Sequence, residues 1–175
     1  MVETPFALSK FLNAVGKDAQ IKTLFLCESI TAYDNLDSIF SLKEAERLTG
    51  IIVGRSDFTK SMGLNKSEVD TKKICDHVEK TLKTAKSKKL ITTMGGNIST
   101  KSSCFVKKMF EKGLLDKIET RNVIIQLNED NIMRLKEVIR QALDFEINWL
   151  RYNSRSYADL SHEYTYRAGL LESRK

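Results

Sequence analysis

Short apolar runs alternate with amphipathic stretches along the first 127 residues of the chain. The apolar runs are short and flanked by glycine or polar residues, which is typical of buried strands; they cover 23–28, 50–54, 90–94 and 118–127. Between them, apolar residues recur every three or four positions, which predicts helices over 5–15, 31–40, 67–87 and 99–112. This alternation favours a parallel α/β sheet with right-handed crossovers.

The pattern changes at Asn128, where a single long amphipathic helix is predicted. Its apolar stripe runs in steps of three and four through Ile132, Leu135, Ile139, Leu143, Ile147 and Leu150. We expect this helix to extend from about Glu129 to Arg151 and to bury the stripe on the outside of the sheet. Apolar anchors thin out after Asn153, so we expect the helix to weaken there. The sequence thus predicts two parts, 1–127 and 128–175.

Size and composition are those of one ordinary globular domain. The chain has 175 residues, of which 41% are hydrophobic and 30% charged. It is shorter than the ~250 residues of a complete eight-fold β/α barrel. It contains no apolar stretch of ~20 residues and begins with no apolar leader, so we expect a cytoplasmic protein without a membrane contact. Three cysteines at irregular spacings, Cys27, Cys75 and Cys104, suit a reducing compartment.

The net charge of +6 is concentrated in one stretch. Residues Lys66 to Lys117 hold 13 Lys against 6 Asp and Glu, a net +7. One interpretation is a basic surface, which together with the Tyr- and Arg-rich tail could make the chain a non-catalytic module that binds a partner protein or nucleic acid. The favoured interpretation is that these lysines coat the solvent faces of two helices, because they interleave with apolar positions. We therefore do not expect nucleic acid as a partner.

Candidate chemistry gathers where the predicted strands end, which is where parallel α/β sheets bind ligands. Glu28 follows the first strand, and Arg55 and Asp57 follow the second. Neighbouring strands lie ~4.8 Å apart, so the two carboxylates could converge on one cation, as in many magnesium sites. The alternatives are a rim ion pair of Glu28 with Lys22 or Arg55, and a helix cap or turn at Asp57.

Two later strand ends add weaker candidates. Gly95 and Gly96 follow the third strand, where their backbone N–H groups could face an anion or simply form a turn. Glu119 and Arg121 are spaced to share one face of the last strand.

Three segments resemble the HpcH/HpaI aldolase and citrate lyase β-subunit family. In Phe25-Leu26-Cys27-Glu28-Ser29 and the following Leu36-Asp37-Ser38-Ile39, the match is to that family's fifth strand and helix. Gly50-Ile51-Ile52-Val53-Gly54-Arg55-Ser56-Asp57, with Gly63 six residues on, is similar to its sixth strand. Met1-Val2-Glu3-Thr4 looks like its fourth.

The resemblance implies a partial (β/α) TIM-type barrel, about strands 4–8, with a C-terminal helical extension. It implies a divalent-metal-dependent carbon–carbon lyase or aldolase acting on a 2-oxo acid or an acyl-CoA-type substrate. Glu28 and Asp57 would hold Mg²⁺ or Mn²⁺, and Gly54, Arg55 and Arg121 would bind substrate. Arg55 replaces the proline or small residue usual in the family, so it is either a substrate-carboxylate clamp or a structural pair.

A partial barrel has consequences for partners. The resemblance covers about residues 1–127 and begins at the family's fourth strand. We therefore expect either a homo-oligomer or a complementing N-terminal half. Four or five strands cannot close an eight-stranded barrel, so we expect apolar strand residues such as Ile51, Val53 and Ile91 to be poorly covered.

Overall fold

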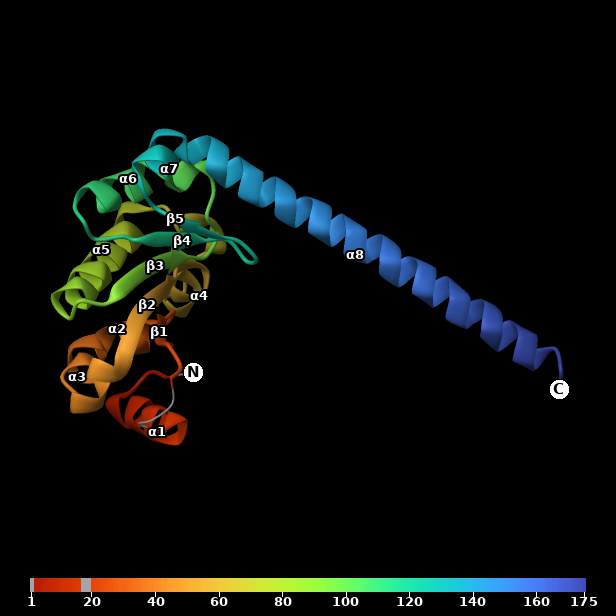
Figure 1. Ribbon diagram of the computed structural model, residues 1–175, viewed down its shortest axis with the longest axis horizontal. Helices are drawn as coiled ribbons and strands as arrows, with labels where there is room; N and C mark the ends of the chain where they lie inside the picture. Colours follow the sequence, from red (N-terminus) through yellow and green to blue (C-terminus); the bar gives the residue numbers. More distant parts are fainter. Residues whose placement is uncertain (1, 17–19) are drawn as a thin grey trace.

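A five-stranded sheet forms the centre of the molecule. The computed structural model describes residues 2–16 and 20–175 (Figure 1). The strands lie in chain order, β1-β2-β3-β4-β5; they are Thr23–Cys27, Leu48–Gly54, Ile91–Gly95, Lys117–Glu119 and Ile124–Gln126. β1 to β4 are parallel and β5 runs antiparallel to β4. The sheet is therefore mixed, and with its connecting helices it forms an α/β fold that is consistent with part of a barrel.

Helices connect the parallel strands, and Figure 1 shows α2, α3, α5 and α6 along one side of the sheet. The α-helices are α1 Pro5–Val15, α2 Ile30–Asp34, α3 Leu36–Phe40, α4 Arg55–Ser61, α5 Lys72–Ser87, α6 Ser103–Glu111, α7 Glu129–Met133 and α8 Leu135–Glu172. Short 3₁₀ turns cover Lys43–Arg47, Lys66–Glu68 and Thr100–Ser102. The predicted start of the first helix is confirmed. The Thr4 side chain accepts a hydrogen bond from the Ala7 N–H at 3.2 Å, and Pro5 takes the first helical position.

Several predicted boundaries are wrong for local reasons. The helix expected over 31–40 is interrupted at Asn35. The helix expected from Ser67 begins at Lys72, and the capping box forms earlier, between Asn65 and Glu68. The strand expected over 118–127 is a hairpin, because the chain turns back after Glu119. Residues 2–4, which resemble the family's fourth strand, form no strand, and residue 1 lies outside the described part.

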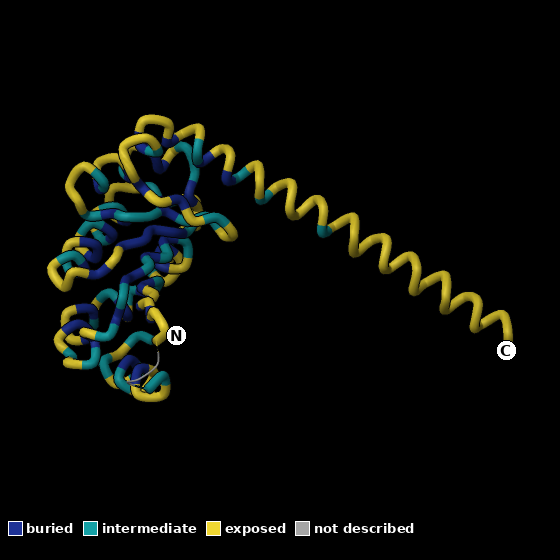
Figure 2. The backbone as a smooth tube through the Cα atoms, in the orientation of Figure 1, coloured by how far each residue is buried: buried dark blue, intermediate teal, exposed yellow. Residues whose placement is uncertain are grey.

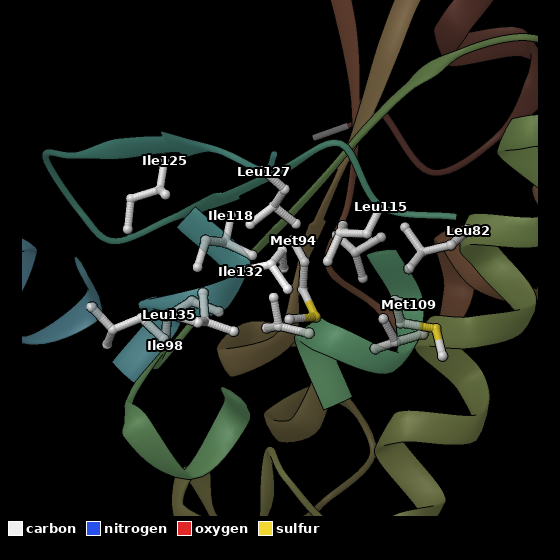
Figure 3. Close-up of a cluster of buried hydrophobic side chains, with 14 of the residues drawn as sticks. Leu82, Met94, Ile98, Met109, Leu115, Ile118, Ile125, Leu127, Ile132 and Leu135 are labelled. Carbon is white, nitrogen blue, oxygen red and sulfur yellow. The ribbon is translucent and has the colours of Figure 1, made fainter. Parts of the chain in front are cut away.

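One face of the sheet packs on the helices and the other is open. Phe25, Ile51 and Val53 point into the core and are at most 2% exposed, so the expectation that Ile51 and Val53 would be poorly covered is wrong. The open face instead carries Leu24 and Leu26, with 49% and 39% exposure, together with Ile91, as expected, at 39%. The register explains this, because side chains alternate between the two faces of a strand. Figure 3 shows the larger core cluster, in which Met94, Ile118 and Leu127 meet residues of the helices.

The long C-terminal helix α8 is anchored only at its start. The predicted stripe residues Leu135 and Ile139 are buried in the main core together with Ala142, and Leu143 is partly buried against it. Beyond them the helix leaves the body and is almost entirely exposed (Figures 1 and 2). Two expectations are therefore wrong: the helix does not weaken after Asn153, and Ile147 and Leu150 stay exposed. Within the described residues, no helix has the length and apolar character needed to cross a membrane.

Candidate functional site

A polar cavity of about 570 Å³ opens at the carboxyl ends of the parallel strands. Four of the five predicted metal- and substrate-binding residues line it: Glu28, Gly54, Asp57 and Arg121. The other polar or charged residues around it are Ser56, Lys60, Lys66, Asn97, Glu119, Thr120 and Glu146. The topology produces this convergence, because the parallel strands of the sheet end at one rim.

Glu28 lies against the backbone of the neighbouring strand. Ser29 follows it and caps α2, accepting a hydrogen bond from the Ala32 N–H at 3.1 Å and donating one to the Glu3 carboxylate. A Cβ atom placed on Gly54 would lie 3.0 Å from the Glu28 Cβ and 3.1 Å from its Oε2. Gly54 therefore leaves room for the carboxylate at the end of β2, and any larger residue there would push it aside.

Two carboxylates repel each other at this rim. Burial raises the pKa of Glu28 above its ordinary value, and the negative charges of Asp57 and Glu3 raise it further. Asp57 stands in the first turn of α4 with its side chain 61% exposed, 3.3 Å from the Lys60 Nζ. A cation between Glu28 and Asp57 would relieve this repulsion. The pair, with room for water and ligand oxygens in the cavity, fits the donor set of a hard divalent cation.

Arg55 takes the structural alternative and does not face the cavity. Its side chain is fully buried, and its N–H groups are directed to acceptors of the protein itself. They donate to the Asp70 carboxylate at 2.7 Å, to the Ser102 hydroxyl at 3.1 Å, and to the carbonyls of Val69, Gly95 and Gly96 at 3.1–3.4 Å. Five donors on five acceptors leave none for a substrate carboxylate, so its expected role as a clamp is not supported.

A third carboxylate, that of Glu119, lies next to Gly95 at the end of β3. Gly54 pairs with Gly95 across β2 and β3. A Cβ atom on Gly95 would come within 2.8 Å of the Glu119 Oε1, so Glu119 lies beside β3 as Glu28 lies beside β2. Burial raises the pKa of Glu119. A carboxyl group with a raised pKa inside a cavity is suited to transfer protons.

The long helix α8 forms part of the cavity wall. Glu146 of α8 accepts hydrogen bonds from the Thr120 hydroxyl and the Asn122 N–H, each at 2.6 Å. These bonds fix the turn of the β4–β5 hairpin that carries Arg121. Arg121 therefore reaches the cavity from a turn and not, as expected, from the same extended strand as Glu119.

Sequence reasoning gave no role to Lys66 and Asn97, which also line the cavity. Asn97 follows Gly95 and Gly96 and has a positive φ of 54°. Its side-chain amide donates a hydrogen bond to the Lys66 carbonyl at 3.4 Å. The position of Asn97 just after β3 was an available signal, whereas Lys66 lies in the 3₁₀ turn Lys66–Glu68 and follows no strand. Among residues 2–16 and 20–175, no cluster of three or more His, Cys, Asp or Glu side chains is placed to hold a metal, so a cation here would rest on two carboxylates.

Neither Cys27 nor the lysine stretch suggests another site. Burial raises the pKa of the Cys27 thiol to about 12, with a contribution from Glu28, so this thiol stays protonated and unreactive. Six lysines of the basic stretch pair with acids on or beside α5 and α6: Lys72, Lys83, Lys86, Lys107, Lys108 and Lys112. These ion pairs agree with the interpretation that the lysines coat the solvent faces of two helices.

Comparisons with known proteins agree with the resemblance. The model of the HpcH/HpaI aldolase/citrate lyase family matches residues 9–108. The fold is similar to the crystal structure of an HpcH/HpaI aldolase/citrate lyase family protein from Burkholderia cenocepacia, with a TM-score of 0.53 and 16% sequence identity. The similarity covers 85% of this chain and 63% of that one, so the chain spans less than two thirds of its length. No curated protein matches the sequence.

Proposed function

The chain belongs to the HpcH/HpaI aldolase/citrate lyase family, and we propose that it is a lyase or aldolase that binds a divalent cation and a 2-oxo acid at the rim of β1 to β4. The observation that carries the proposal is the meeting of Glu28 and Asp57 in one cavity, with Gly54 clearing the space beside Glu28. The proposed ion is Mg²⁺ or Mn²⁺, because two carboxylates with open positions suit these ions.

The residues of the cavity divide into three roles. Glu28 and Asp57 would hold the cation. When bound, the cation would act as a Lewis acid toward the carboxylate and keto oxygens of the substrate. Lys66 and Arg121 carry the positive charges that can bind and orient an anionic substrate.

Glu119 would move the proton. Burial raises its pKa, which makes its carboxylate a stronger base, so it would accept a proton from the carbon next to the keto group and, once protonated, return it. Gly95 leaves the space in which its carboxylate lies. This role is independent of Arg55, whose donors are used within the protein.

The proposal also includes a partner. Leu24, Leu26 and Ile91 lie on the open face of the sheet, and β1 and β5 are the edges of the sheet. We propose that the β/α units without counterpart here, carried by a complementing N-terminal half, cover this face. An exposed apolar surface next to a binding cavity is a common mark of an interface.

Proton exchange into pyruvate provides a test that needs no knowledge of the second substrate. In D₂O with Mg²⁺, we expect the protein to exchange the methyl protons of pyruvate, followed as the loss of the methyl signal by proton NMR. EDTA should stop the exchange. Asp57→Asn should slow it by at least ~100-fold, because even partners outside the ligand shell typically contribute 10–100-fold to a metal site.

The matched control is Asp76→Asn, since Asp76 lies on α5 in an exposed pair with Lys72. This variant should exchange pyruvate at the rate of the unchanged protein. Exchange that continues in EDTA, or that is equal in both variants, would remove the cation from the proposal.

A further inference from the structure

The exposed part of α8 carries a regular stripe that the proposed function does not use. From Leu143 onward, the less polar side of the helix recurs in alternating steps of four and three residues. It starts at Leu143, which is partly buried against the core and lines the cavity, and is exposed from Ile147 onward. We call the nine residues of this line the heptad stripe: Leu143, Ile147, Leu150, Ser154, Tyr157, Ser161, Tyr164, Ala168 and Leu171. It contains no charged residue. A seven-residue repeat sustained over four heptads is the pattern of a helix that supercoils with another helix.

From Leu150 onward, large and small residues alternate along the stripe. Every seventh residue from Leu143 is large: Leu143, Leu150, Tyr157, Tyr164 and Leu171. Every seventh residue from Ile147 is small after the first: Ile147, Ser154, Ser161 and Ala168. The helix therefore presents one line of large side chains and, beside it, a line that is small from Ser154 onward.

This alternation fits a second copy of the same helix in one orientation. In a parallel pair, equivalent positions meet, so Tyr157 would face Tyr157 and Ser161 would face Ser161, with crowding and gaps in turn. In an antiparallel pair the two lines exchange, so large residues meet the small residues Ser154, Ser161 and Ala168, and Ile147 alone faces another large residue. The surface is then complementary to itself across a two-fold axis.

The exposed area and the charge of the helix also suit this partner. Leu150, Tyr157, Tyr164 and Leu171 are 60–70% exposed. With Ile147 and the adjacent Leu160, 45% and 44% exposed, they offer on the order of 600 Å² at ~150–250 Å² per large side chain, near the ~800 Å² per partner of a standard interface. Residues 144–175 contain five Arg or Lys and five Asp or Glu, so two copies meet without net repulsion.

Packing against such a partner would stabilise the exposed part of the helix. Past Ala142 it runs for 30 residues, to Glu172, with Ser, Asn, Thr, Tyr and Gly residues that favour helix only weakly. Most helical stability in proteins comes from packing of an apolar face. We propose that two copies of this chain associate through the heptad stripes of their α8 helices, packed antiparallel.

Two pairs of tyrosines distinguish association through the heptad stripe from nonspecific association of the exposed helix. Tyr157 and Tyr164 lie on the stripe, and Tyr152 and Tyr166 lie off it, yet all four are 60–70% exposed. In sedimentation velocity at tens of micromolar, we expect the unchanged full chain to be a dimer. The double variant Tyr157→Glu and Tyr164→Glu should be a monomer, and Tyr152→Glu with Tyr166→Glu should remain a dimer. A monomeric unchanged chain, or equal effects of both pairs, would overturn the proposal.

The orientation is tested by distances between spin labels in the full chain. Cys75 and Cys104 are first replaced by Ser, and a single cysteine is introduced at Glu172 or, separately, at Ser156. Antiparallel helices should place two labels at 172 on the order of 40 Å apart or more, given ~1.5 Å rise per residue, and two labels at 156 within about 20 Å. Short distances at both positions would mean parallel helices and would overturn the antiparallel proposal.

Discussion

A chain that ends at Leu127 is expected to lose its fold. Ile132, Leu135, Ile139 and Ala142 come from α7 and α8 and are at most 9% exposed in the main core. Burying a side chain such as Leu or Ile contributes ~1.5–3 kcal/mol, so the three largest together contribute roughly 4–9 kcal/mol. That is comparable to the ~5–15 kcal/mol by which a whole domain is stable. Removing them also exposes Ile118 and Ile125.

The measurement is circular dichroism and a thermal melt of two shortened chains. The chain that ends at Leu127 should precipitate or show no cooperative transition. The chain that ends at Asn153 keeps every residue of the core cluster and Glu146 of the cavity wall, so it should melt cooperatively. If the first chain stayed soluble with an unchanged melting temperature, the start of α8 would not belong to the core.

Replacement of Arg55 by Met is expected to destabilise the protein by about 3–5 kcal/mol, the range for breaking a buried ion pair by removing one partner. The change leaves Asp70 without its cation and leaves the Gly95 and Gly96 carbonyls and the Ser102 hydroxyl without their donor. It should lower the urea midpoint strongly with little change in slope.

The matched control is Arg140→Met, because Arg140 is exposed on α8 and surface substitutions usually change stability by less than ~0.5 kcal/mol. A substrate clamp would behave differently from a structural residue. If Arg55→Met kept its stability and lost only affinity for a 2-oxo acid, the buried placement of Arg55 would be wrong.

The local pattern of the sequence predicted the parallel part of the fold well. Apolar runs bounded by glycine gave β2 and β3 within a few residues, and the strand-end rule brought Glu28, Asp57 and Arg121 to one cavity. These predictions succeed because they depend on periodicity and on the geometry common to all parallel sheets.

The predictions that failed depend on tertiary contacts. The ten residues 118–127 were predicted to form one strand because the β-branched run of the second arm follows closely on Ile118, and the short turn at Thr120 to Val123 contains no glycine or proline to mark it. Arg55 looked like a site residue because it follows a strand, yet the acceptors that bury it, Asp70 and Ser102, are distant in sequence. The burial of Ile51 and not of Leu24 depends on which face the helices cover.

The prediction for the long helix was wrong for a different reason. The stripe of the helix predicts burial against the sheet, and within α8 only Leu135 and Ile139 of the stripe are buried there, with Leu143 partly buried. A helix with a regular stripe can also bury it against another chain. The helix was expected to weaken after Asn153 because apolar anchors thin out and because Ser154, Arg155, Ser156 and Asp159 favour a break. In a heptad repeat, Ser154 is instead one of the small positions of the stripe, as are Ser161 and Ala168.

The central claim is that Glu28 and Asp57 together bind one divalent cation, and a Mn²⁺ titration followed by electron paramagnetic resonance tests it most directly. We expect one Mn²⁺ per chain in the unchanged protein and in Asp76→Asn. Glu28→Gln and Asp57→Asn should each weaken the affinity at least ~100-fold, about 2.8 kcal/mol at 1.4 kcal/mol per tenfold. Binding of equal strength in all four proteins, or none in the unchanged protein, would contradict the claim.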